Sequence, residues 1–104
     1  MDKDSAQKIV DLLVHARRRP GMFFPVDYSG ISGFLGGIQA LQRALFGVAY
    51  NETLTTNLLK ERGWDTPNSL APWPEMKDRG LDIHAMIEEV LTIEIEILRR
   101  SYNL

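Results

Sequence analysis

Residues 31 to 47 make up a segment in which neither side of the predicted helix is polar. At 100° per residue, one side collects large apolar side chains and the opposite side collects glycine and alanine. The large side consists of Ile31, Phe34, Leu35, Ile38, Leu41, Leu45 and Phe46, and the small side of Gly33, Gly36, Gly37, Ala40, Ala44 and Gly47. Such a helix has no face suited to water, so the fold must cover both sides.

The small side of this segment favours close approach of another backbone. Glycine costs about 1 kcal/mol relative to alanine inside a helix, so a series of glycines indicates that close packing compensates for this cost. The simplest interpretation is a central helix crossed tightly by helices of the same chain. The alternatives are a ligand groove and a homodimer formed through Gly33, Gly37, Ala40 and Ala44.

The C-terminal segment carries two conflicting patterns. Strict alternation from Thr92 to Ile97 is typical of a strand. Over the longer range from 82 to 102, the apolar residues instead form one broad helical arc opposite polar residues, which favours a helix. An α+β domain with a strand from Leu91 to Leu98 remains the alternative.

Two more helices are predicted, at about 5 to 18 and 52 to 62. With the segments at about 31 to 47 and 82 to 100, they give an all-α bundle of four main helices in which the second is central. A chain of 104 residues, 44% of them hydrophobic, supports one core, so residues 1–104 are expected to form a single domain.

Charge and composition narrow the functional classes. The net charge of −2 gives no general electrostatic footprint for nucleic acid, and the absence of cysteine removes disulfides and thiolate chemistry. No run approaches the ~20 apolar residues of a membrane span, and the acidic N-terminus does not resemble a signal peptide. We therefore expect a cytoplasmic protein without membrane or nucleic-acid partners, and no cofactor or metal is indicated.

Glu94 interrupts the apolar arc of the C-terminal helix. A buried carboxylate must find a cation, take up a proton or meet solvent, and Arg17 lies at the edge of the apolar stripe on the first helix. A buried ion pair between Glu94 and Arg17 is one prediction and an exposed Glu94 is another. A ligand or catalytic pocket that uses Glu94, Arg17 and His84 is the third.

The connection from Gly63 to Gly80 is long and rich in tryptophan and proline. Long loops in compact domains are often functional, and tryptophan is a common interface anchor. We predict partner contacts at Trp64, Trp73, Asp65, Glu75 and Asp78, with buried, purely structural tryptophans as the alternative. Pro74 is also placed to open a short helical turn through Arg79.

Two resemblances involve the turn Arg18-Arg19-Pro20-Gly21-Met22-Phe23. This turn resembles the Arg-Pro-Gly-Met-Tyr segment near the start of gyrase B and related GHKL ATPases. In that family the next helix supplies a catalytic Glu and a magnesium-binding Asn, whereas the corresponding positions here are Gly37 and Leu41. The resemblance therefore does not extend to ATP hydrolysis.

The second resemblance covers about residues 8 to 46. The same turn followed by Ile31-x-x-Phe34-Leu35-x-Gly37 is similar to small bacterial proteins with an Arg-Pro-Gly-Met-aromatic turn, some of them immunity-type proteins encoded beside toxins. It implies a noncatalytic protein that binds a protein partner. The acidic residues predicted as contacts would orient a basic partner, so the partner expected here is a basic toxin domain. The alternative function is a small ligand-binding protein or enzyme that uses Glu94 and Arg17.

Overall fold

The fold is all-α, as the sequence predicts. The computed structural model describes residues 3–47, 52–65 and 73–104, and none of these residues forms a strand. The helices are α1 (Lys3–Arg18), the 3-10 turn η1 (Pro20–Met22), α2 (Tyr28–Phe46), α3 (Glu52–Glu61), α4 (Trp73–Asp78) and α5 (Ile83–Tyr102). The alternative of a strand from Leu91 to Leu98 is wrong, because the whole of that segment lies within α5.

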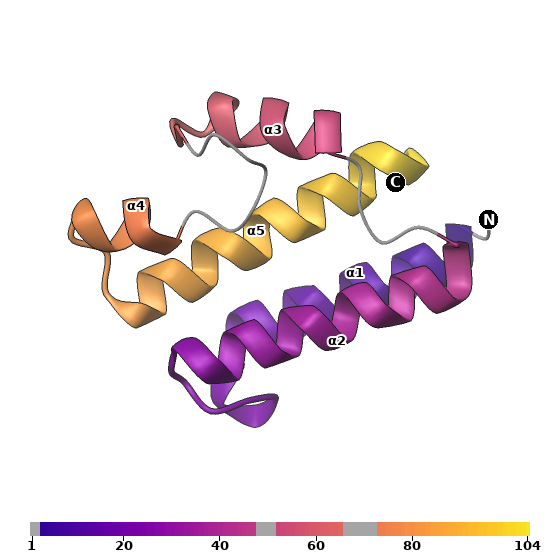
Figure 1. Ribbon diagram of the computed structural model, residues 1–104. Helices are drawn as coiled ribbons and strands as arrows, with labels where there is room; N and C mark the ends of the chain where they lie inside the picture. The colour runs from indigo at the N-terminus through magenta and orange to yellow at the C-terminus, as the bar shows by residue number, and fades with distance from the viewer. Residues whose placement is uncertain (1–2, 48–51, 66–72) are drawn as a thin grey trace.

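The central position expected for the second helix belongs to α5. Figure 1 shows α5 running between α1 and α2 on one side and α3 and α4 on the other, and α5 packs closely against α1, α3 and α4. Ala6 and Ala16 of α1 are fully buried. The closest helix packing therefore uses alanines of α1 and not the glycines of α2.

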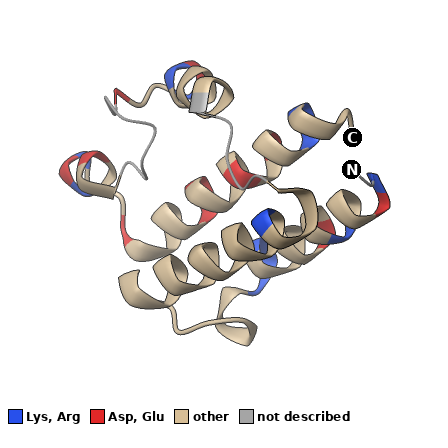
Figure 2. Ribbon diagram, turned by 45° about the vertical axis from the view of Figure 1, so that its right-hand side comes forward, with Lys and Arg blue, Asp and Glu red and all other residues tan. Residues whose placement is uncertain are grey.

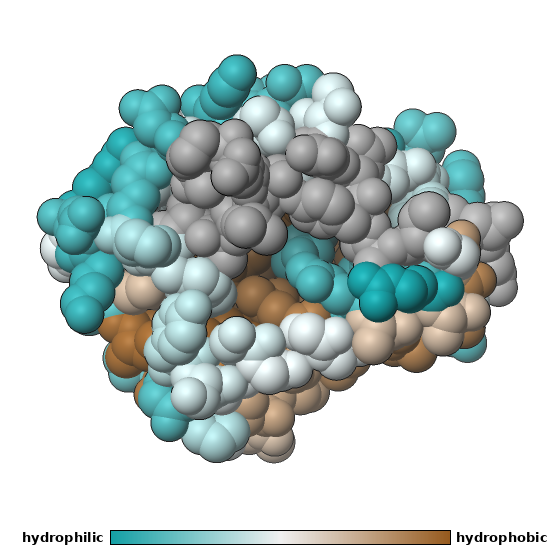
Figure 3. Space-filling model, in the orientation of Figure 1, coloured by the Kyte–Doolittle hydropathy of each residue, from teal (hydrophilic) through white to brown (hydrophobic). Residues whose placement is uncertain are grey.

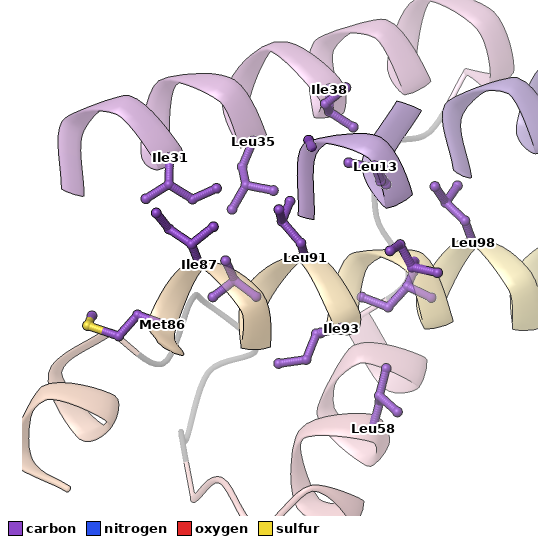
Figure 4. Packing of buried hydrophobic residues seen from close by; sticks show 14 of the residues in the cluster. Leu13, Ile31, Leu35, Ile38, Leu58, Met86, Ile87, Leu91, Ile93 and Leu98 are labelled. Carbon is purple, nitrogen blue, oxygen red and sulfur yellow. The ribbon is translucent and has the colours of Figure 1, made fainter. Parts of the chain in front are cut away.

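The position of α5 explains its strand-like sequence. Leu91 points toward α1 and α2, whereas Ile93 points toward Leu58 of α3 on the other side (Figure 4). Residues two apart on a helix differ by about 200° in direction, so alternating isoleucines serve two neighbouring layers at once. Ile93, Ile95 and Ile97 are all buried.

One side of α2 completes the core. Ile31, Leu35 and Ile38 are buried and face α5 and α1 (Figure 4). The helix begins at Tyr28, three residues before the predicted start, because the side chain of Asp27 accepts a hydrogen bond from Gly30 N at 2.7 Å. Gly30 is required at this start, since a Cβ atom there would lie 1.8 Å from Pro25 O.

The short segments follow the predicted pattern in part. The predicted turn of helix at Pro74 is present as α4, and its Met76 is fully buried. The helix predicted at about 52 to 62 is present as α3, and Asn51, which would cap it, lies outside the described residues. In the turn after α1 only Phe24 enters the core, and Met22 is 73% exposed.

Candidate functional site

Glu94 lies half-buried on α5 and faces α2. Gln39 Nε2 donates a hydrogen bond to Glu94 Oε1 at 3.3 Å. Burial raises the pKa of the Glu94 carboxyl, and the hydrogen bond from Gln39 opposes that shift. The carboxyl therefore meets a neutral amide from α2 and not a cation.

The predicted ion pair between Glu94 and Arg17 is not formed among the described residues. Arg17 Nη1 instead donates to Thr92 Oγ1 at 3.0 Å, and the Thr92 hydroxyl donates to Glu88 O at 2.8 Å. Thr92 and Glu94 are two residues apart on one helix, so their side chains point in different directions. Arg17 reaches the side of α5 that carries Thr92.

His84 does not join Glu94 either. It is exposed in the first turn of α5, ten residues before Glu94, which corresponds to about 15 Å along the helix axis. The predicted pocket of Glu94, Arg17 and His84 is therefore not assembled. The described part of the chain also contains no group of three His, Asp or Glu residues suited to a metal ion.

Trp64 is buried, which favours the structural alternative over a contact role. The residue is 6% exposed, and its Nε1 donates to Glu89 Oε2 at 2.7 Å. The guanidinium carbon of Arg79 lies 4.6 Å from the ring centroid, within cation–π range. Trp73 is half-buried, and its ring meets Tyr28 edge to face at 5.2 Å between centroids.

Three of the predicted contact residues belong to one internal network. Both carboxylate oxygens of Glu75 accept from Asp65 N, at 2.8 and 3.1 Å, and the same carboxylate pairs with Arg79 beneath Trp64. Asp78 is exposed on α4. The network holds the end of α3 next to α4, so the side chains of Trp64 and Glu75 already have structural partners, while Asp65 contributes its backbone N–H.

Glu89 joins this network, and the sequence offered no signal for it. Arg62 binds both of its oxygens, at 2.6 and 2.8 Å, and Trp64 binds one of them. The hydrogen bonds from Arg62 hold the pKa of Glu89 below its usual range against the opposing effect of burial, and the bond from Trp64 adds to this. These partners are 27 and 25 residues away, beyond any local spacing rule.

The small side of α2 faces outward, which corrects the expectation of a tight crossing within the chain. A Cβ atom built at Gly33, Gly36 or Gly37 meets no other element of the described chain within 4 Å. Leu41 and Leu45, which the sequence assigns to the large side, are 41% and 52% exposed, so the uncovered surface extends from the small side onto part of the large side. We call this surface the α2 outer face: Gly33, Gly36, Gly37, Ala40, Leu41, Ala44 and Leu45. In Figure 3 the surface of α2 passes from a pale region to tan and brown.

Two hollows adjoin the N-terminal end of the α2 outer face. One, of about 420 Å³, is lined partly by Phe23, Gly30, Gly33 and Phe34. The other, of about 260 Å³, is lined by His15, Arg18, Arg19, Met22 and Phe23. Phe23 lines both hollows, and its ring meets that of Phe34 at 6.2 Å between centroids. The two hollows and the α2 outer face therefore form one continuous surface.

No protein-family model, curated protein or solved structure matches this chain. In the residues that the structure describes, no helix combines the length and apolar character needed to cross a bilayer.

Proposed function

We propose that this chain is a noncatalytic protein-binding domain whose binding surface is the α2 outer face. The supporting observation is that this face is exposed along α2 although it carries Leu41, Leu45 and no charged residue. Contiguous apolar surface on a folded domain marks an interaction site, and glycines allow a partner backbone to approach closely. The proposal moves the interface from the tryptophan-containing loop to α2.

The arrangement of the polar residues favours this proposal over the pocket alternative. An enzyme or ligand-binding protein built on Glu94 would need Arg17 or His84 beside it. Arg17 is bound to Thr92, and His84 lies at the far end of α5. Glu94 is hydrogen-bonded to the neutral amide of Gln39, so it has no second titratable group beside it to complete an acid–base pair among the residues predicted for the pocket.

The test removes the apolar character of the surface without adding charge. Leu41→Gln with Leu45→Gln is compared with native protein in pull-downs from the source organism, after circular dichroism has established that the variant is folded. Lys60→Gln with Lys77→Gln, two exposed residues on α3 and α4, is the matched control. A partner retained by native and control proteins but lost by the leucine variant is expected. Equal recovery by all three would contradict the proposal.

An immunity-type inhibitor of a toxin is the more specific form of this proposal. The turn at Arg19-Pro20-Gly21-Met22 and the start of α2 carry the resemblance that suggests it. Co-expression with the product of the neighbouring reading frame tests it, because an immunity protein should restore growth to cells that make the toxin. Unchanged toxicity would remove this form and leave protein binding in place.

A homodimer through Gly33, Gly37, Ala40 and Ala44 is the second candidate. It is favoured by the same observation, that no described element of the chain covers these residues. Soluble chains most often assemble as two-fold dimers. Sedimentation of native protein and of Gly37→Leu tests it, because a dimer should dissociate when leucine fills the close approach.

A further inference from the structure

The arginines of this chain fall into two groups with different partners. Each of the four arginines after residue 52 forms an ion pair with a carboxylate: Arg62 with Glu89, Arg79 with Glu75, Arg99 with Glu96 and Arg100 with Glu61. The four arginines before residue 47 form no ion pair in the described part of the chain. Arg17 is bound to the Thr92 hydroxyl, and Arg18, Arg19 and Arg43 are exposed.

The sequence has the same division of charge. Residues 15 to 47 contain four arginines against the single acid Asp27, a net charge of +3, and Asp27 caps α2. Residues 52 to 104 contain ten acidic and six basic residues, a net charge of −4. Figure 2 shows red turns on α4 and along α5, with others on α1 and α3, while α2 is almost entirely tan. The overall charge of −2 therefore conceals a basic region beside the α2 outer face.

These unpaired arginines lie at the two ends of the α2 outer face. Arg18 and Arg19 line the hollow that connects through Phe23 to Gly30 and Gly33. Arg43 is exposed in the last turn of α2. From Gly30 to Arg43 the distance along the helix axis is about 20 Å, the length of a partner helix of about 13 residues.

We propose that the α2 outer face binds an acidic amphipathic helix of a partner protein. This inference rests on the proposed function and names an acidic partner in place of the basic toxin domain expected from the sequence. The apolar side of the partner helix packs against Leu41 and Leu45 and fits closely over the glycines. Its Asp and Glu residues pair with Arg18 and Arg19 at one end and with Arg43 at the other, which aligns the partner helix along α2 and speeds its association.

Charge and shape favour this occupant over two others. A second copy of the chain would bring one basic border against another in either orientation, because arginines lie at both ends of the face. Binding to a membrane surface depends on large apolar side chains that enter the bilayer, whereas most of this face is glycine and alanine. A helix with its own side chains fills such a shallow surface better.

The test uses three synthetic helical peptides with the same apolar face. Each is about 20 residues long, with leucines at helical spacing, and its polar positions are all Glu, all Gln or all Lys. Fluorescence anisotropy gives the dissociation constant of each peptide for native protein at low and high salt. The Glu peptide is expected to bind at least about tenfold more tightly than the Lys peptide, with a difference that shrinks as salt screens the charges.

Two charge variants locate the effect. Arg18→Glu with Arg19→Glu is expected to weaken the Glu peptide by about tenfold or more and to leave the folded structure intact, since both side chains are exposed. Lys60→Glu with Lys77→Glu makes the same change in net charge on α3 and α4, and it is expected to have little effect. Equal weakening by both pairs would overturn the inference, because it would show a response to net charge alone.

The remaining outcomes separate this inference from the proposed function. If all three peptides bind equally and all are lost in Leu41→Gln with Leu45→Gln, the acidic partner is wrong and the α2 interface stands. If no peptide responds to the leucine substitutions, both are wrong. A native dimer that the leucine substitutions dissociate, or tighter binding to phosphatidylserine vesicles than to the Glu peptide, would assign the face to another occupant and overturn the inference.

Discussion

The indole Nε1 of Trp64 donates a hydrogen bond to Glu89 Oε2 at 2.7 Å. Arg62 binds the same carboxylate, so one acidic residue of α5 holds two residues that directly follow α3. A tryptophan that the sequence suggests as an exposed anchor thus connects two helices of the core.

Trp64→Phe is expected to lower the free energy of unfolding by about 1–3 kcal/mol. The phenylalanine ring keeps much of the packing but cannot donate a hydrogen bond to Glu89. A hydrogen bond to a charged group contributes about this much free energy to stability. Urea denaturation measures the loss. Trp73→Phe is the matched control, because Trp73 is half-buried and its ring meets Tyr28 edge to face. Equal losses in the two variants would argue against a special role for the bond to Glu89.

Gly30→Ala and Gly33→Ala are expected to have opposite effects on stability. A Cβ atom at Gly30 would overlap Pro25 O, so the turn before α2 must shift and the variant is less stable than native protein. A Cβ atom at Gly33 meets open space, so alanine should stabilise α2 by up to about 1 kcal/mol through its better helix propensity. Thermal unfolding of the two variants distinguishes these effects. A stabilised Gly30→Ala variant would show that Pro25 O does not lie against Gly30 in this turn.

Glu94→Gln is expected to stabilise the protein more as pH rises. Burial raises the pKa of Glu94 in the folded state, so between the unfolded and folded pKa values the folded state holds the extra proton. The stability contributed by this group is therefore present below the unfolded pKa and lost as pH rises through the folded pKa. Glutamine cannot titrate and escapes this loss.

The measurement is the free energy of unfolding of native and Glu94→Gln proteins from about pH 4 to about pH 8. Glu88→Gln provides a control at an exposed position of the same helix. The difference between Glu94→Gln and native protein should grow with pH above the unfolded value. A difference that is constant or shrinks would mean that the Glu94 carboxyl is not desolvated.

Double-mutant cycles are expected to couple Arg17 to Thr92 and not to Glu94. Arg17→Met and Thr92→Val remove the two ends of a 3.0 Å hydrogen bond, so their combined effect should depart from additivity by about 0.5–1.5 kcal/mol. Arg17→Met with Glu94→Gln should be additive within about 0.5 kcal/mol. Coupling of Arg17 to Glu94 without coupling to Thr92 would contradict this expectation and support the ion pair predicted from the sequence.

Helical periodicity predicts most of the fold because it reports on side chains within one segment. The arc from Ile83 to Tyr102 is long enough to outweigh the local alternation, and the structure confirms the helix. The start of α2 is harder to predict from the sequence, since it depends on one hydrogen bond that the Asp27 side chain accepts from Gly30 N. A wheel that considers only apolar residues does not register such a cap.

The functional residues are harder to predict because their exposure and their partners depend on how the other helices pack around them. The pattern around Gly33 and Gly37 identifies a surface without polar groups, but only the tertiary arrangement shows that it stays uncovered. Similarly, Glu94 stands out as a carboxylate in an apolar arc, whereas its amide partner Gln39 comes from a separate helix. Side chains 55 residues apart have no spacing from which to infer contact.

The outward glycines leave one side of the α2 backbone without side-chain cover. Segments with few buried contacts open locally before the whole molecule unfolds. We therefore expect the amide hydrogens from Gly33 to Ala44 to exchange with deuterium much faster than those from Leu91 to Leu98, which are surrounded by other helices. A helix laid over the glycines would close that backbone to solvent, and slowed exchange along α2 would trace its position residue by residue.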